Sequence, residues 1–245
     1  MATIHLIDGE KGGVGKSFVA RTMIQYGLDR NLTFTAVETD RSNPDVAGVY
    51  QDICKFAVFS ENEKQADKAD RIFEMATEQP VIVSLPSQVH RSVKGWIERN
   101  KLFELTDEYG VSFCKWFVTN GEYDSVKLFS SSLEAYGQDI THILVRNTGL
   151  CDEWSQVDED ESLQKLIKKY KVKVIDFPKL AHKERYIINK EQMRLDDARD
   201  CKELGILGKQ RVVNFLKAAY AAFDSTGVWQ QKSSEAVESK QSNPS

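Results

Sequence analysis

The most informative stretch of this sequence is Lys11-Gly12-Gly13-Val14-Gly15-Lys16-Ser17. A short apolar run, Ile4 to Ile7, precedes it, and apolar residues with helical spacing follow from Phe18 onward. A strand, a glycine-rich turn and a helix form the context in which backbone N–H groups and a helix N-terminus bind phosphate. In such a loop Lys16 reaches the β- and γ-phosphates and the Ser17 hydroxyl ligates Mg²⁺. Residues 12–18 are therefore predicted to bind the phosphates of a nucleotide together with Mg²⁺.

The loop departs from the general P-loop pattern at one position and adds a second lysine. Glu10 stands where the pattern wants a glycine, and Lys11 follows it. The stretch resembles the deviant Walker A box of the ParA/MinD family of ATPases. In that family the early lysine reaches the phosphates of the partner's nucleotide. The resemblance thus implies ATP and Mg²⁺ as cofactors, a homodimer in the ATP state, and catalytic roles for Lys11 and Lys16.

Asp40 is the third catalytic candidate. It follows a predicted strand over residues 32–37, within Glu38-Thr39-Asp40, and the ligands of open α/β sheets bind at the carboxyl ends of their strands. The family places an acidic-x-Asp pair here, so the resemblance makes Asp40 the residue that directs the attacking water and supports Mg²⁺. The alternative is that Asp40 caps the turn that runs on to Pro44.

Ser84 marks a second departure from the family. The apolar run Val81-Ile82-Val83 is typical of a buried parallel strand, and Ser84-Leu85-Pro86 follows it. The family has Asp-x-Pro at this point, with the Walker B aspartate in the place of Ser84. A serine can hold a water on Mg²⁺ but brings no charge, which puts fast hydrolysis more in question than nucleotide binding.

Two further residues are candidates for the adenine pocket. Asn147 ends a predicted strand over residues 140–147, and its amide offers both a donor and an acceptor to a purine edge. The alternative is an ordinary turn asparagine. Pro178 follows the last predicted strand, residues 172–177, where the family often has a proline against the base.

The order of elements predicts an α/β fold. Strands are expected at residues 3–8, 32–37, 81–83, 111–118, 140–147 and 172–177, and helices at 16–29, 62–78, 90–100, 123–136, 163–170 and 208–224. No element is assigned to residues 183–199. This alternation predicts a doubly wound, mostly parallel sheet flanked by helices. The resemblance makes it a P-loop NTPase domain of the SIMIBI type over residues 1–228, followed by a disordered polar tail over residues 229–245.

Composition narrows the class of protein. The 245 residues carry a net charge of −4, and no run of about 18 apolar residues suggests a membrane span. The first strand begins at once, which leaves no room for a signal peptide. The four cysteines are scattered without a CxxC pair, so we expect reduced thiols in a cytoplasmic protein. The tail lacks an apolar face, so no membrane anchoring is expected.

Basic residues gather in the C-terminal half. Residues 162–217 contain 15 Lys and Arg against 7 Asp and Glu. Family members that use the nucleoid as a track bind DNA non-specifically through such residues, which makes DNA a candidate partner and nucleoid association a candidate location. The alternative is a solvated helix face balanced by the acidic stretch at residues 152–161.

Three functions remain open at this stage. The first is a ParA-like ATPase, similar to the plasmid partition and mobilisation (MobD-like) branch, that positions DNA or another cargo with an adaptor protein. The second is an enzyme of the same fold that uses ATP to activate a small molecule, against which Lys11 argues. The third is a nucleotide-binding module without hydrolysis, which Ser84 favours.

Overall fold

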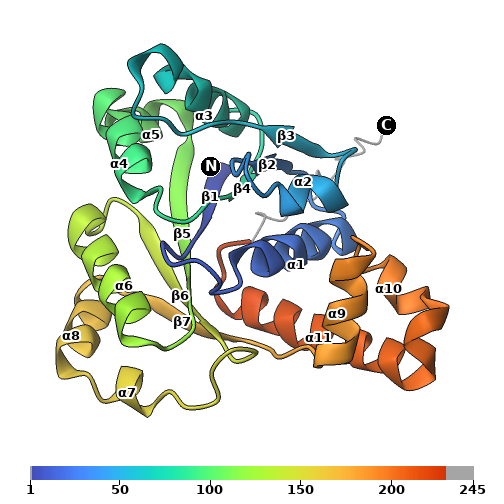
Figure 1. The fold of residues 1–245 in the computed structure, drawn as a ribbon. Coiled ribbons are helices and arrows are strands. Elements are labelled where there is room, and N and C mark those ends of the chain that lie inside the picture. The colour runs from blue at the N-terminus through green and yellow to red at the C-terminus, as the bar shows by residue number, and fades with distance from the viewer. Residues whose placement is uncertain (1, 230–245) are drawn as a thin grey trace, which may run out of the picture.

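Residues 2–229 are described by a computed structural model (Figure 1). Within them, seven strands form one parallel sheet in the order β3-β2-β4-β1-β5-β6-β7. The strands are β1 (Ala2–Asp8), β2 (Thr35–Glu38), β3 (Cys54–Phe56), β4 (Val81–Ser84), β5 (Val111–Thr119), β6 (Thr141–Asn147) and β7 (Lys173–Phe177). The predicted doubly wound α/β fold is confirmed.

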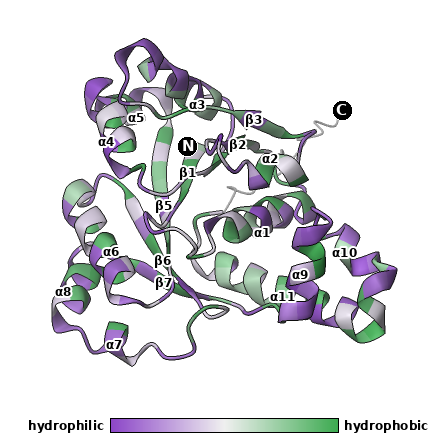
Figure 2. Cartoon of the chain, in the orientation of Figure 1, coloured by the Kyte–Doolittle hydropathy of each residue, from purple (hydrophilic) through white to green (hydrophobic). Residues whose placement is uncertain are grey.

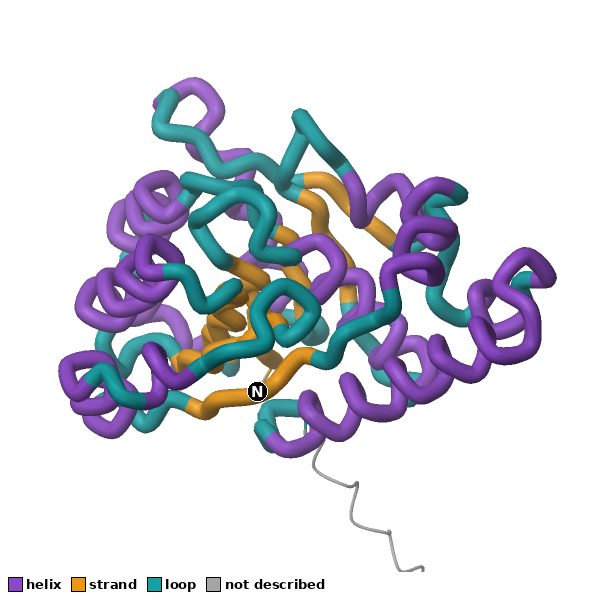
Figure 3. The backbone as a smooth tube through the Cα atoms, turned by 60° about the horizontal axis from the view of Figure 1, so that its bottom comes forward, coloured by secondary structure: helices purple, strands orange, loops and turns teal. Residues whose placement is uncertain are grey.

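Helices cover both faces of this sheet (Figures 1 and 3). They are α1 (Lys16–Asp29), α2 (Asp45–Val49), η1 (Glu63–Ala69), α3 (Asp70–Ala76), α4 (His90–Arg99), α5 (Leu102–Tyr109), α6 (Tyr123–Tyr136), α7 (Ser155–Asp158), α8 (Glu161–Lys169), α9 (His182–Lys190), α10 (Asp197–Asp200), η2 (Lys202–Leu204) and α11 (Gly205–Ser225). The two η elements are 3-10 helices.

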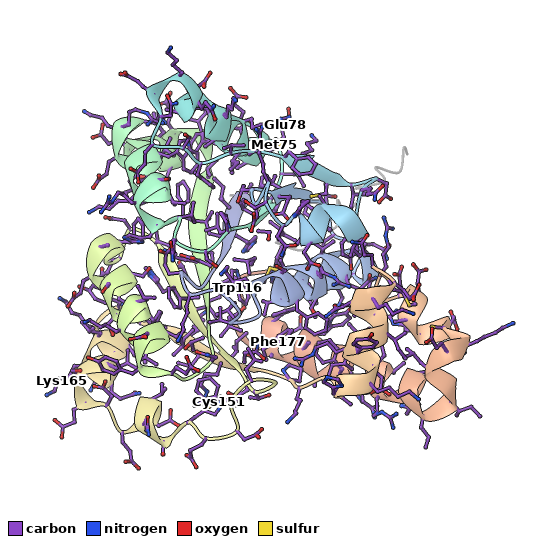
Figure 4. The ribbon with its side chains drawn as sticks, in the orientation of Figure 1. Met75, Glu78, Trp116, Cys151, Lys165 and Phe177 are labelled. Atoms are coloured by element: carbon purple, nitrogen blue, oxygen red, sulfur yellow. The ribbon has the colours of Figure 1, made fainter. Side chains whose placement is uncertain are left out.

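Successive residues of a strand supply different cores because side chains alternate across a sheet. Three apolar clusters result, one of which packs Phe117 of β5 and Leu144 of β6 against α6 and α8. Ile4 and Leu6 of β1 pack with Trp96 of α4 and other apolar residues of α3 to α5. Ile7 and the β5 residue Trp116 pack instead with α1, α9 and α11. The strands accordingly appear mostly hydrophobic in Figure 2, and Figure 4 shows Trp116 near the centre of the molecule.

The structure adds elements that the sequence pattern did not predict. These are β3, α2, α5, α7 and η2, and also α9 and α10, which occupy most of the region from 183 to 199 that was left without an element. The predicted helix over 62–78 is instead η1 followed by α3, and the strand predicted at 32–37 begins only at Thr35. Pro80 O accepts a hydrogen bond from Thr35 N, which ties the start of β2 to the residue before β4.

The C-terminal end of the described chain packs against the sheet. The ring of Trp229 stacks on His5 of β1 with 4.0 Å between ring centroids. Trp229 was predicted to begin the polar tail, and the rest of that tail lies outside the described residues. Among residues 2–229, no helix combines the length and apolar character needed to cross a membrane.

The sheet changes winding direction beside β1. The strands β4, β2 and β3 lie on one side of β1, whereas β5, β6 and β7 lie on the other. The loop after β1 therefore emerges where neighbouring connections diverge, which is where open α/β sheets form a ligand crevice. Glu38, Ser84, Asn147 and Phe177 end their strands at this same edge.

Candidate nucleotide site

The glycine-rich loop turns from β1 into α1 through left-handed backbone. Gly13 has φ of 81° and Gly15 has φ of 98°, a region that strains any residue with a Cβ. A Cβ on Gly15 would also lie 2.3 Å from Nδ2 of Asn147, which belongs to the end of β6. α1 then begins at Lys16, so its N-terminal N–H groups face the loop. This backbone fits a phosphate group, because it presents N–H donors at a positive helix end.

A cavity of about 400 Å³ opens beside this loop. It brings together eight of the predicted site residues, namely Gly13, Gly15, Lys16, Ser17, Phe18, Asp40, Asn147 and Pro178. Three others do not line it: Val14 is buried in the core, and Lys11 and Gly12 line a second cavity shared with α6. Eight of the residues predicted from the sequence therefore end or follow four different strands and line one cavity.

Lys16 is held inside the loop. Its Nζ donates to the backbone oxygen of Lys11 at 3.1 Å and to Oγ of Ser87 at 3.0 Å. Burial lowers the pKa of Lys16, against the opposing influence of the carboxylates of Asp8, Glu10 and Asp40. A phosphate group would restore the charge partner that this ammonium lacks at close range.

Asp40 both caps its turn and faces the cavity, so the two readings of this residue are compatible. Its Oδ1 accepts from the backbone N–H groups of Ser42 at 2.9 Å and Asn43 at 3.0 Å. Its other carboxylate oxygen makes no hydrogen bond within the described part of the chain. That oxygen is the group available to a water molecule or to Mg²⁺.

Glu38 lies two residues before Asp40 and is almost completely buried. Its carboxylate accepts three backbone N–H groups, from Thr39, Asp40 and Val46. Burial raises the pKa of Glu38 to about 7, although the three N–H donors act in the opposite direction.

Ser84 occupies the place of the family's Walker B aspartate. It ends β4, in register with Ile7 of β1 and Glu38 of β2, and it lines the cavity. Its backbone oxygen accepts from Oγ1 of Thr39 at 2.6 Å. The departure from the family pattern is therefore inside the site.

Asn147 braces the glycine-rich loop. Its Nδ2 donates to the backbone oxygen of Val14 at 2.9 Å, and its Oδ1 accepts from Gly149 N at 3.1 Å. Recognition of adenine by Asn147 stays a prediction. Around it the cavity wall is apolar, and it is formed by Phe18, Leu150, Phe177, Pro178 and Leu180. Figure 4 shows Phe177 beside α1 and α11.

Sequence reasoning missed Arg21. This residue of α1 is 1% exposed and lines the cavity. Its guanidinium donates to Oδ1 of Asn189 at 3.0 Å and to the backbone oxygen of Met193 at 2.9 Å, and it lies 3.6 Å from Oδ1 of Asp45. The available signal was its spacing of four from Ser17, which places both on one face of α1. Asn43, Asp45, Arg185 and Asn189 line the cavity as well.

Lys11 does not line this cavity and forms an ion pair with Glu122, the residue before α6. The Lys11 side chain is 33% exposed and that of Glu122 is 59% exposed. In this arrangement Lys11 does not contribute to the nucleotide cavity of its own subunit.

The donor set fits Mg²⁺ bound together with a nucleotide. No group of three or more His, Cys, Asp or Glu side chains in residues 2–229 forms a metal cage. Mg²⁺ favours one or two protein oxygens combined with phosphate oxygens and water, which is what Ser17 and Asp40 offer. All four cysteines are free thiols, in keeping with their scattered spacing.

Comparisons with curated proteins give two distant relatives, whereas no family model matches the chain. The chain is 29% identical over 146 residues to Protein MobD of Acidithiobacillus ferrooxidans, a match covering 59% of this chain and 63% of that protein. It is 22% identical to Protein TraL of Escherichia coli, over 93% of this chain and all of TraL. The match thus spans less than two thirds of MobD.

Solved structures show the fold. The MinC:MinD cell division complex of Aquifex aeolicus has a TM-score of 0.50 at 11% identity, covering 89% of this chain and 94% of that one. MinD from Pyrococcus horikoshii in complex with Mg-ADP has a TM-score of 0.50 at 12% identity, covering 88% and 94%. The chain therefore has the fold of these MinD structures, built around a glycine-rich loop that carries Lys11 ahead of Lys16.

Proposed function

We propose that this protein is an ATP-dependent switch whose ATP-bound form is a homodimer. One observation carries the proposal: Lys16 and Ser17 of α1, Asp40 after β2 and Ser84 after β4 line a single cavity at the N-terminus of α1. These side chains meet the needs of phosphoryl transfer, which are positioning and charge neutralisation. The complex of P. horikoshii MinD with Mg-ADP supports Mg²⁺ and an adenine nucleotide as the ligands of this cavity.

Each residue has a separate part in this account. The loop N–H groups and Lys16 bind the phosphates, and the Ser17 hydroxyl and Asp40 would hold Mg²⁺, which neutralises phosphate charge when bound. Asp40 orients a water through the carboxylate oxygen that its turn leaves free. Phe18, Pro178 and Leu180 offer an apolar wall to the base, and Asn147 is the candidate for its polar edge.

The proposed dimer assigns a functional role to Lys11. In the present arrangement Lys11 pairs with Glu122 and lines a second cavity rather than the nucleotide cavity. In the dimer, Lys11 of each subunit would contact the nucleotide of the other, as the resemblance to the family implies. Hydrolysis would then remove the contact and separate the subunits.

We propose that the switch positions DNA, or another cargo, together with an adaptor protein. It would act in the cytoplasm or on the nucleoid. The resemblance to the partition and mobilisation branch and the partial match to MobD support this choice. Ser84 favours a second candidate, a nucleotide-dependent binding module with little or no hydrolysis, because the site lacks the carboxylate found at that position in the family.

Steady-state ATP turnover with and without duplex DNA separates the two candidates. The switch predicts measurable Mg²⁺-dependent turnover that Asp40→Ala abolishes while ATP binding survives. Tight ATP binding without turnover, in the presence or absence of DNA, would favour the binding module.

A further inference from the structure

The Glu38 carboxylate accepts hydrogen bonds from both ends of one loop. One carboxylate oxygen accepts from Thr39 N and Asp40 N, both at 2.9 Å, and the other accepts from Val46 N at 3.1 Å. The backbone between these contacts runs through Asp40, Asn43 and Asp45, all of which line the nucleotide cavity. A single side chain therefore closes the base of the loop that carries the water-directing candidate.

These three hydrogen bonds require a carboxylate side chain. Glu38 is 1% exposed and has no ion-pair partner within residues 2–229, so three N–H donors supply all the hydrogen bonds seen there. An ionised carboxylate accepts on both oxygens, whereas the amide of glutamine would turn an NH₂ group toward one of the donors.

The neighbouring strand leaves this loop few other anchors. The backbone oxygen of Ser84 accepts from both N and Oγ1 of Thr39 at the start of the loop, and Arg21 lies 3.6 Å from Asp45. The tip residues Arg41 to Pro44 are exposed. Asp40 also accepts from Ser42 N and Asn43 N, but those contacts lie within the loop, so the contacts at the loop base are the ones that fix the loop to the sheet.

We propose that Glu38 is a positioning residue that fixes both ends of the 39–46 loop and thereby holds the Asp40 carboxylate in the nucleotide cavity. The consequence for turnover rests on the proposed ATPase function, whereas the order of the loop does not. Glu38 does not touch the nucleotide in this account, and it acts only through Asp40.

The test compares Glu38→Gln and Glu38→Asp with the wild type. The matched control is Glu74→Gln, because Glu74 is exposed on α3 and its carboxylate makes no hydrogen bond or ion pair with the described residues. Limited trypsin digestion reports loop order through cleavage after Arg41, quantified by mass spectrometry of the fragment that begins at Ser42. Steady-state kinetics report kcat and KM for ATP.

For Glu38→Gln, cleavage after Arg41 should accelerate by about tenfold, since a buried backbone N–H group loses its acceptor and proteolysis follows the open population. A misplaced Asp40 should lower kcat by about 10- to 100-fold. KM for ATP should stay within about threefold, because Lys16 and the loop N–H groups are untouched. Glu38→Asp, one methylene shorter, should give a smaller change in both readouts and remains informative if Glu38→Gln does not fold.

Cleavage and kcat that match Glu74→Gln in both Glu38 variants would overturn the proposal. If the wild type shows no turnover, the proposed ATPase function fails by itself. In that case the rate of cleavage after Arg41 alone decides whether Glu38 holds the loop.

Discussion

Nζ of Lys16 donates a hydrogen bond to Oγ of Ser87 at 3.0 Å, which links the glycine-rich loop to the segment that follows β4. The same Nζ also bonds the backbone oxygen of Lys11. The ammonium group is therefore already held at the N-terminal end of α1, and binding of a phosphate would require little rearrangement of this side chain.

Lys16→Ala should weaken ATP binding by about 100-fold, because it removes charge-assisted hydrogen bonds to the phosphates. Isothermal calorimetry measures this loss directly. Lys64→Ala serves as a control with the same change of charge on an exposed residue of η1. Unchanged ATP affinity in Lys16→Ala would refute the phosphate-binding assignment of the loop.

Ser84→Asp should raise turnover at saturating ATP by about tenfold, because it adds a carboxylate near the expected Mg²⁺ position. Ser84→Asn, of similar size but uncharged, should not have this effect. Phosphate release assays on both variants make the comparison. An equal rate in Ser84→Asp and the wild type would show that the serine does not limit hydrolysis.

Asp8 and Lys115 form an ion pair beneath the loop, with 2.7 Å between Oδ2 and Nζ and both side chains at most 1% exposed. Lys115→Met should lower the free energy of unfolding by about 3–5 kcal/mol, because it leaves a buried carboxylate without a counter-ion. The double variant Asp8→Asn with Lys115→Met should recover most of this loss. Chemical denaturation measures both, and equal instability of the single and double variants would contradict the account.

The pH dependence of the pair follows from the same contacts. Burial tends to raise the pKa of Asp8, but Lys115 and the backbone N–H groups of Gly9 and Glu10 outweigh it and lower this pKa below its usual value. The stability that Asp8 contributes is thus present above the ordinary carboxylate range and is lost as pH falls through the lowered value.

Much of the fold was predictable because its buried strands are continuous apolar runs and its first loop has an informative motif. β3 escaped prediction because it spans only Cys54 to Phe56 and its side chains are partly or largely exposed. Helix α9 was not predicted because its sequence is mostly charged and polar, with only Ile187 and Ile188 as a short apolar pair. In the site, Arg21 was missed because charged helix residues usually face solvent, whereas the packing of α9 and α2 encloses this one.

The basic residues of the C-terminal half do not form one surface. Helix α8, whose sequence contains Lys165, Lys168 and Lys169, lies at the left of the molecule in Figure 1, and α9 lies at the right. Figure 4 shows Lys165 at the outer edge of α8, where it pairs with Glu161. Lys168, Lys169 and Lys171 are exposed and have no ion-pair partner in the described part of the chain.

If duplex DNA binds at α8, changing Lys168, Lys169 and Lys171 to Glu should abolish sequence-independent binding of the ATP form at low salt. Changing Lys64 and Lys68 to Glu, on η1, should leave that binding in place. Fluorescence anisotropy at low and high salt provides the measurement. An Asp40→Ala protein that binds ATP but no DNA at low salt would exclude a DNA track and leave a protein cargo.

The most direct test of the central claim is sedimentation velocity of the wild type and Lys11→Ala with ATP and Mg²⁺, with ADP, and without nucleotide. Glu122→Ala controls for loss of the Lys11–Glu122 ion pair, because it retains Lys11. We expect dimers only for the wild type and Glu122→Ala in ATP, and a monomer for Lys11→Ala that still binds ATP. A sedimentation coefficient that does not change with nucleotide, or a normal ATP-dependent dimer of Lys11→Ala, would contradict the account.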